Sequence, residues 1–379
     1  MKVSIIGAST AGLFTAFLLA KEGVEVEVYE MASALGWPPR TLIVTRKITQ
    51  VLDFVPQEAI VNRIKYFELF SKTRSAKIEL GTPDLVIERG KLIKMLGSLA
   101  DGVGAKIMLG HQFEGFTRNG RRIVLSLKNL AANEEKRIET DVLIGADGVG
   151  SAVCQAALGN GHRLSALIQA RVLFPENVDH DTVKVWFDPQ KTKYFYWLIP
   201  ESSRAAAVGL IADNAQKAET CLRMFLQEKQ FVDSPEVQRA LVPVHPFKYA
   251  DCDLISRQNI FVLGDAAGHV KVTTVGGLVS GLNGARALTK ALLNGGNIRR
   301  EFGRLNSELN LHALVRKVLN KFGDDHYDEL ITMLQGELKE VLEKWTRDEL
   351  RQSYFKLILS EPRLITLGMK ALLRTKAWS

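Results

Sequence analysis

The chain opens with Val3-Ser-Ile-Ile-Gly-Ala-Ser-Thr-Ala-Gly12, and a further apolar run leads to Val24-Glu-Val-Glu-Val-Tyr-Glu30. This order predicts a strand, a tight turn, a helix and a second strand, with Gly7 in the turn and Gly12 where helix and strand pack closely. The first turn of such a helix presents free backbone N–H groups to a pyrophosphate. Glu30 ends the second strand, where a carboxylate accepts hydrogen bonds from ribose hydroxyls. The stretch therefore predicts a Rossmann-like α/β unit that binds a dinucleotide.

Two small residues and one arginine complete the predicted dinucleotide site. Ser9 replaces the usual middle glycine of the turn, where its side chain could crowd the pyrophosphate or its hydroxyl could hydrogen-bond it. Ala11 lies beside it at the start of the helix. Arg40, in the loop beyond the second strand, could reach a phosphate; the alternative is a solvated surface arginine. Because Glu30 disfavours a 2′-phosphate, NADP is a poor occupant. The alternative for the whole stretch is an ordinary βαβ turn.

Two further apolar runs end in turns that contain an aspartate and a glycine. The first ends at Asp147-Gly148 and the second at Gly264-Asp265. A carboxylate at the end of a strand can hold a ligand hydroxyl, although Asp147 could also be a plain turn residue. After the second turn, a glycine-rich segment opens a helix whose first N–H groups are expected to face a ligand. The residues that would do this are Gly276, Gly277 and Leu278.

The fingerprint and the two aspartate–glycine turns occur in the order found in the aromatic-hydroxylase-like flavoproteins, and the chain resembles their geranylgeranyl reductase family. The resemblance implies FAD as the cofactor. It also implies that Arg89, in Val86-Ile-Glu-Arg-Gly-Lys-Leu, opens a helix next to the flavin, with a surface position as the alternative. Phe113, at the end of a strand expected over 105–113, would contact the cofactor through its backbone. The first motif usually ends in Ser-x-x-Arg, but Cys154 stands in the arginine's place, so no arginine role is carried over there.

The middle of the chain changes character. Runs rich in aromatic and β-branched residues, at 183–187, 194–199 and 204–211, predict an antiparallel sheet that covers the flavin and forms a substrate pocket. The segment Phe195-Tyr-Trp-Leu-Ile-Pro200 is similar to the Tyr-x-Trp-x-Phe-Pro motif of geranylgeranyl reductases. An apolar wall suits a polyprenyl chain, which binds by burial; the alternative is that these aromatics only form the core of the sheet. The substrate-pocket candidates are Phe195, Trp197 and Pro200.

The last part of the chain is helical and charged. Apolar periodicity predicts helices over 301–322, 325–346, 347–359 and 365–375, with a break at Pro362. Geranylgeranyl reductases carry a similar helical extension, so the resemblance covers essentially the whole chain. The last helix is basic and amphipathic. Such a helix can lie on an anionic membrane, but we expect it to dock on its own protein.

Composition limits the class of protein. With 379 residues, of which 46% are hydrophobic and 24% charged, the chain can bury a large core. The net charge of +8 favours anionic partners, but nucleic acid is not expected because Lys and Arg are spread along the chain. Three distant cysteines give no metal-ligand spacing and no disulfide framework, so no metal is expected. The same cysteines fit a reducing compartment.

These features predict location and architecture. Glycines interrupt the apolar N-terminal run, so we do not expect a signal peptide, and no run is long enough to span a membrane. We expect a cytoplasmic protein, with peripheral contact at the inner face of the membrane as an option. The predicted fold class is α/β. Residues 1–160 and 250–300 are expected to form a discontinuous FAD-binding domain, 161–249 a β-rich substrate domain, and 301–379 the helical extension.

The predicted activity follows from the resemblance. A reduced flavin would deliver a hydride to a carbon–carbon double bond of a polyprenyl, geranylgeranyl-type chain in a lipid or lipid precursor. The electron donor would be a reduced nicotinamide nucleotide or a ferredoxin-like protein. No residue stands out as the catalytic acid. Alternatives are an FAD-dependent monooxygenase or, with less support, a halogenase, acting on an apolar or aromatic substrate, and a non-catalytic protein that binds flavin and lipid. A quinone-reducing iron–sulfur flavoprotein is excluded, because three scattered cysteines cannot ligate a cluster.

Overall fold

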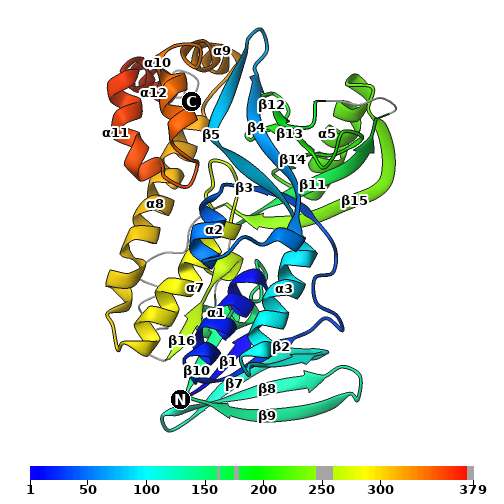
Figure 1. The fold of residues 1–379 in the computed structure, drawn as a ribbon, viewed down its shortest axis with the longest axis vertical. Helices are drawn as coiled ribbons and strands as arrows, with labels where there is room; N and C mark the ends of the chain where they lie inside the picture. The colour runs from blue at the N-terminus through cyan, green and yellow to red at the C-terminus, as the bar shows by residue number, and fades with distance from the viewer. Residues whose placement is uncertain (160–162, 175–178, 245–258, 374–379) are drawn as a thin grey trace.

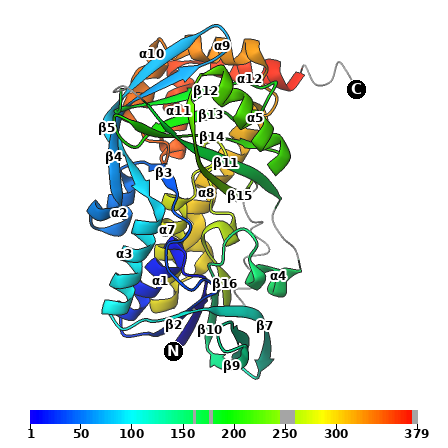
Figure 2. The same cartoon turned by 90° about the vertical axis from the view of Figure 1, so that its right-hand side faces the viewer.

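The structure is a computed structural model that describes residues 1–159, 163–174, 179–244 and 259–373. A parallel sheet lies at the bottom of Figure 1 and an eight-stranded sheet at the top. The helices that follow residue 297 run up one side of the molecule and cover part of the upper sheet. Figure 2 shows the same order of layers after a quarter turn.

The lower sheet consists of β1 (Lys2–Ile6), β2 (Glu25–Glu30), β6 (Lys106–Leu109), β10 (Val142–Gly145) and β16 (Ile260–Val262). All its strands are parallel, in the spatial order β16-β10-β1-β2-β6. Both faces are buried, as is usual for parallel sheets. On β1, Val3 and Ile5 pack against helices, whereas Ile6 packs against a small sheet on the other face.

The layers that cover the lower sheet come from distant parts of the chain. One face carries α1 (Thr10–Lys21), α3 (Arg89–Gly102) and α7 (Leu278–Leu293). The other face carries β7 (His111–Asn119), β8 (Arg122–Asn129), β9 (Glu134–Thr140) and α4 (Ala152–Leu158). Because β1, β10 and β16 are parallel neighbours, the turns that follow them meet at one edge of the sheet.

The upper sheet has the strand order β15-β11-β14-β13-β12-β4-β5-β3. Its strands are β3 (Thr41–Val44), β4 (Ile60–Phe70), β5 (Ser75–Glu88), β11 (Leu164–Leu173), β12 (Thr182–Trp186), β13 (Tyr196–Pro200), β14 (Ala205–Ala212) and β15 (Val232–Pro243). Helix α5 (Ala215–Glu228) covers one face, where Tyr196 and Leu198 are buried. Their neighbours Trp197 and Ile199 point to the opposite face, as strand alternation requires.

The C-terminal helices are α8 (Ile298–Leu319), α9 (Asp324–Met333), α10 (Glu337–Lys344), α11 (Leu350–Ser360) and α12 (Arg363–Leu373). They bury a cluster of leucines against the hairpin of β4 and β5, where Ala76 and Ile78 lie. Short helices occur at α2 (Lys47–Leu52), η1 (Gln57–Ala59) and η2 (Gly264–Ala267). No helix in the described ranges is both long and apolar enough to cross a bilayer.

The expected α/β fold with a helical extension is confirmed, and two local predictions need correction. The strand expected over 105–113 is two strands in different sheets, because Gly110 takes a left-handed conformation (φ +69°) and turns the chain. The helix expected over 325–346 ends at Met333 and restarts after Gly336. The runs predicted to form an antiparallel sheet do pair in that way, as β12, β13 and β14, and the larger upper sheet adds a parallel pair between β12 and β4.

The turn after β1 generates a prediction about stability. Gly7 has φ +98°, and a Cβ atom there would lie 2.5 Å from the carbonyl oxygen of Ala146 and 2.7 Å from Cα of Asp147. Gly23 (φ +77°) is the matched control, because a Cβ atom there would have nothing within 4 Å. We expect Gly7→Ala to lower the free energy of unfolding by about 1–3 kcal/mol more than Gly23→Ala does. Equal losses in urea unfolding of the two variants would contradict the close-packing argument.

Candidate active site

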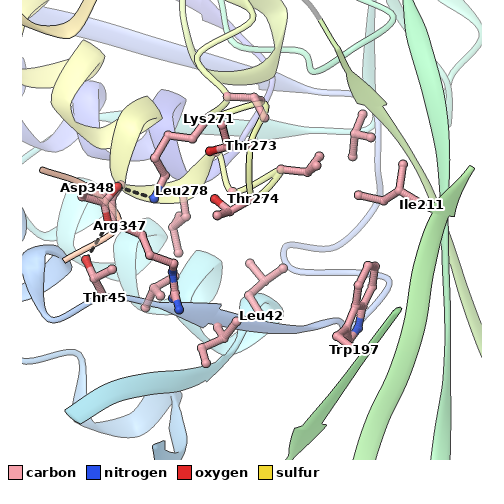
Figure 3. A pocket seen from close by; sticks show the side chains of 18 of the residues that line it. Leu42, Thr45, Trp197, Ile211, Lys271, Thr273, Thr274, Leu278, Arg347 and Asp348 are labelled. Carbon is pink, nitrogen blue, oxygen red and sulfur yellow. Dashed lines mark hydrogen bonds and ion pairs between the residues drawn. The ribbon is translucent and has the colours of Figure 1, made fainter. Parts of the chain in front are cut away.

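A cavity of about 600 Å³ lies between the edge of the parallel sheet and the upper sheet. Its lining includes the turn after β1, the turn after β16, the start of α7 and the inner face of the upper sheet. The C-terminal helices also contribute to it. Figure 3 shows the two walls, with Trp197 and Ile211 of the upper sheet facing Lys271, Thr274 and Leu278 across the cavity.

The turn after β1 is held in shape by its own hydrogen bonds. Glu30 accepts hydrogen bonds from the backbone N–H groups of Ala8 and Ala32, both at 2.8 Å. The hydroxyl of Ser9 caps α1 by accepting from the N–H of Gly12 at 3.2 Å. Ser9 and Ala11 line the cavity, whereas Gly12 packs against the turn of Gly7. The predicted residues therefore lie together, with Glu30 bracing the turn.

The two strand-end aspartates have different surroundings. Asp147 accepts from the hydroxyl of Ser151 at 2.6 Å and from the N–H of Val153 at 3.2 Å, so its carboxylate caps α4 and does not line the cavity. Burial raises the pKa of Asp147 above its ordinary value, against these hydrogen bonds. Gly148 and Asp265 do line the cavity.

Two arginines meet near Asp265 at the edge of the sheet. Burial, and next the neighbouring charge of Arg89, lower the pKa of Arg40 to about 10, while Asp265 acts in the opposite direction. Burial likewise lowers the pKa of Arg89. The Nε atom of Arg40 is buried and has no hydrogen-bond partner among the described residues. Two half-buried arginines and an unused donor fit an anionic group such as a pyrophosphate.

The segment before α7 brings the last group of predicted residues to the same place. Gly276, Gly277 and Leu278 line the cavity, and a Cβ atom on Gly277 would lie 2.9 Å from Oδ1 of Asp265. Helix α7 begins at Leu278, so its first N–H groups lie at the cavity wall. This arrangement suits the approach of a flat, polar ring system to the backbone.

Like Asp147, the predicted residues Phe113 and Pro200 lie away from the cavity lining, which also lacks Gly7, Gly12 and Glu30. The side chain of Phe113 is buried under the three-stranded sheet, with Tyr29 and Ile123. Pro200 is buried at the end of β13, where its carbonyl oxygen accepts from the side-chain amide of Asn62 at 2.9 Å. Neither side chain lines the cavity.

The aromatic residues of β13 and the residue before it divide between the core and the cavity. Phe195 and Trp197 line the cavity, and their rings make an edge-to-face contact with centroids 6.2 Å apart. The indole N–H of Trp197 is buried without a hydrogen-bond partner among the described residues. Tyr196 instead stacks on Phe225 of α5 in the core.

Sequence reasoning missed the wall that the C-terminal helices contribute. Its apolar lining continues from the sheet to α9–α12 through Tyr327, Leu330, Leu334, Leu338, Leu342, Leu357 and Leu364. Four of these leucines are spaced by four residues, which is a signal for one apolar helix face. That signal does not say whether the face meets a protein core or a cavity.

Sequence reasoning also missed two buried ion pairs at the cavity. Lys271 pairs with Asp348, and Asp348 also accepts from the hydroxyl of Thr45 (Figure 3). Burial alone would raise the pKa of Asp348, but the Lys271 ammonium and the Thr45 hydroxyl hold it below its ordinary value. Arg347 pairs with Asp84 at 2.6 Å. These pairs fasten the C-terminal helices to the turn before α7 and to β5.

The chain is similar to known proteins in sequence and in fold. Digeranylgeranylglycerophospholipid reductase 1 of Methanothermobacter thermautotrophicus is 26% identical, over 97% of both chains. Geranylgeranyl diphosphate reductase of Rhodobacter capsulatus is 24% identical, over 85% of this chain and 83% of its own. The solved structure of a geranylgeranyl bacteriochlorophyll reductase-like protein from Thermoplasma acidophilum has a TM-score of 0.82 at 18% identity, over 98% of both chains. A halogenase variant in complex with FAD has a TM-score of 0.65 at 14% identity, over 97% and 85%.

A protein-family comparison agrees with the suitability of the cavity for a dinucleotide. The sequence pattern of the FAD binding domain family covers residues 1–297, which include every residue predicted to contact the cofactor. The chain therefore belongs to the FAD binding domain family and is an FAD-dependent oxidoreductase.

Proposed function

We propose that this protein reduces carbon–carbon double bonds of a prenyl chain in a lipid or lipid precursor. The observation that carries the proposal is the continuous apolar wall between the residues predicted to contact FAD and the leucines of α9–α12. A long hydrocarbon chain binds such a wall by burial, with little need for hydrogen bonds. The relatives named as geranylgeranyl reductases, which align over most of this chain, support the same substrate class.

The residues of this chain would contribute position and exclusion of water. When bound and reduced, FAD would supply the hydride for one alkene carbon, and a proton would be needed for the neighbouring carbon. Arg40 and Ser9 would hold the pyrophosphate, and Glu30 the adenosine ribose. The N–H groups of Gly277 and Leu278 would face the polar edge of the flavin ring. Trp197 would press the prenyl chain toward the ring from the opposite wall.

The experiment that tests the proposal is mass spectrometry of prenyl lipids incubated with the purified protein. The protein is reduced with dithionite and incubated without oxygen and then in air. Gain of hydrogen pairs without oxygen would support the proposal. Gain of an oxygen atom only in air would replace it with a monooxygenase. Intact lipid beside reoxidisable flavin would indicate a binding protein. Parallel reactions with NADH, NADPH and reduced ferredoxin identify the donor.

We propose that α11 and α12 rest on the cytoplasmic face of a lipid membrane. Phe355 and Leu359, one turn apart on α11, are 73% and 79% exposed. On α12, Leu367 and Ala371 are buried, so the helix docks on the protein, while its other face leaves Ile365, Met369, Leu372 and Leu373 exposed. Arg374 and the residues after it lie outside the described ranges. Since Leu357 and Leu364 of the same helices line the cavity, a prenyl lipid could enter beside this surface.

Removing the Glu30 carboxylate should weaken FAD binding. Glu30→Ala removes the proposed ribose contact and the brace on the turn, and we expect FAD affinity to fall about tenfold or more. Glu25→Ala is the control, because Glu25 is an exposed carboxylate on the same strand. Fluorescence titration of the apoprotein with FAD measures the FAD affinity of both variants. Unchanged affinity in Glu30→Ala would exclude the ribose contact.

Truncating Trp197 should impair prenyl reduction and leave the flavin bound. The indole forms part of the apolar wall, so we expect Trp197→Ala to raise the KM for a prenyl lipid about tenfold and Trp197→Phe to have a smaller effect. The visible absorbance of bound FAD is measured on the same samples. If Trp197→Ala loses its FAD, the indole belongs to the cofactor site instead.

Polar substitutions on α11 should weaken membrane binding. Burying Phe355 and Leu359 in lipid is worth on the order of 1.5–3 kcal/mol each, so the double change to serine should reduce binding to phosphatidylglycerol vesicles at least tenfold. Leu130→Ser is the control, because Leu130 is 43% exposed in the β8–β9 turn at the opposite end of the molecule (Figure 1). Equal co-sedimentation of the double variant and the unmodified protein would rule out this surface.

A further inference from the structure

The turn between Lys271 and Gly276 has a strained backbone. The N–H of Lys271 donates to the carbonyl of Gly276 at 3.1 Å, and the N–H of Val275 donates to the carbonyl of Lys271 at 2.7 Å. Val275 has φ +53°, a left-handed conformation that a β-branched residue rarely adopts. Strain of this kind persists only when surrounding contacts hold it, and it is concentrated at functional sites. The cavity-lining segment 276–278 continues directly from this turn.

Arg316 of α8 is the side chain that holds the turn from outside. Its Nε donates to the carbonyl of Val272 at 2.8 Å and its Nη2 to the carbonyl of Thr273 at 2.5 Å. Its Nη1 donates to the carbonyl of Lys193 at 2.9 Å, on the segment that leads into β13. Arg316 therefore joins both walls of the cavity to the C-terminal helices.

His312, one helical turn before Arg316, holds the same turn. Its Nδ1 lies 2.5 Å from the hydroxyl of Thr273, and its Nε2 lies 3.5 Å from Glu308. Asp348 holds Lys271 at the start of the turn. Three residues that follow residue 300 thus fix a segment at the FAD site, and of these Arg316 makes the most hydrogen bonds to the backbone.

The charge of Arg316 has no acidic partner among the described residues. The groups that act on it electrostatically are the hydroxyls of Tyr327 and Tyr194, and burial lowers its pKa. Its guanidinium lies over the ring of Tyr194, 4.6 Å from the centroid. The other two cations near this end of the cavity, Lys271 and Arg347, are each paired with an aspartate. A buried cation whose hydrogen-bond acceptors are neutral carbonyl oxygens leaves a positive potential in the cavity, which Arg316 lines.

We propose that Arg316 is a positioning residue that fixes the FAD-facing turn and whose positive charge favours reduced over oxidised FAD. The inference rests on FAD binding and is independent of which substrate is reduced. Two-electron reduction increases the negative charge on the flavin ring. A fixed cation in a low-dielectric cavity therefore stabilises the reduced form more than the oxidised form. The C-terminal helices would then influence the midpoint potential of bound FAD as well as the shape of the cavity.

The test is the midpoint potential of bound FAD, measured in dithionite titrations with a reference dye. Arg316→Gln keeps an amide donor and removes the charge. We expect it to lower the preference for reduced over oxidised FAD about tenfold, which is about 30 mV for a two-electron couple. Arg316→Lys keeps the charge, so the midpoint potential of its bound FAD should stay close to that of the unmodified protein. Arg304→Gln, an exposed arginine on the same helix, should leave the potential unchanged.

Two outcomes would overturn the inference. An unchanged potential in Arg316→Gln would do so, and so would an equal shift in Arg316→Lys, because the effect would then not follow charge. If Arg316→Gln does not fold, Leu319→Glu is compared with Leu319→Gln. Leu319 lines the cavity on the same helix, and an added carboxylate there should lower the potential relative to the neutral amide; equal potentials would overturn the inference. Absence of FAD from the unmodified protein would instead refute FAD binding itself.

Discussion

The structure depends on the close approach of two strand-end turns at the edge of the parallel sheet. Gly7 lies against the backbone of Ala146 and Asp147, leaving no room for a Cβ atom. This contact holds β1 and β10 in register and lets α1 begin directly over the sheet edge. The turn after β16, the second neighbour of β10, then falls beside them. The close contact at Gly7 thus helps to bring the turns after β1, β10 and β16, from three distant parts of the chain, into one site.

Electrostatics explains why the same cavity suits an anionic cofactor and an apolar substrate. Near the sheet edge, Arg40 and Arg89 are half-buried and close to each other, with Asp265 acting on both and Glu88 and Glu30 also acting on Arg89. Burial of like charges is unfavourable unless an anion joins them, so this end is suited to the pyrophosphate. Toward α9–α12, the lining is leucine and aromatic carbon. The charged groups between the two ends are mostly paired, and this limits the cost of placing them beside hydrocarbon.

The C-terminal helices are part of the site as much as part of the scaffold. They close the apolar end of the cavity, and through Arg316 and Asp348 they hold the turn before α7. A similar overall fold occurs in the FAD-bound halogenase variant. A shared fold does not specify a reaction. In this protein the side chains that distinguish the cavity come mainly from the upper sheet and from the helices after residue 297.

Local sequence patterns were enough to predict the parallel α/β unit and its three strand-end turns, and most of the residues proposed to bind the cofactor line the cavity. These depend on apolar runs, on glycines at tight turns and on an acidic residue at the end of β2. The tertiary structure was needed to establish that the side chain of Asp147 turns toward α4, that Pro200 lies away from the cavity, and that Lys271 meets Asp348. The same is true of the pairing of β12 with β4 and of the leucines of α9–α12 that face a cavity. Those features arise from contacts between distant parts of the chain or from the direction in which a side chain or helix faces, and the local periodicity of a chain specifies neither.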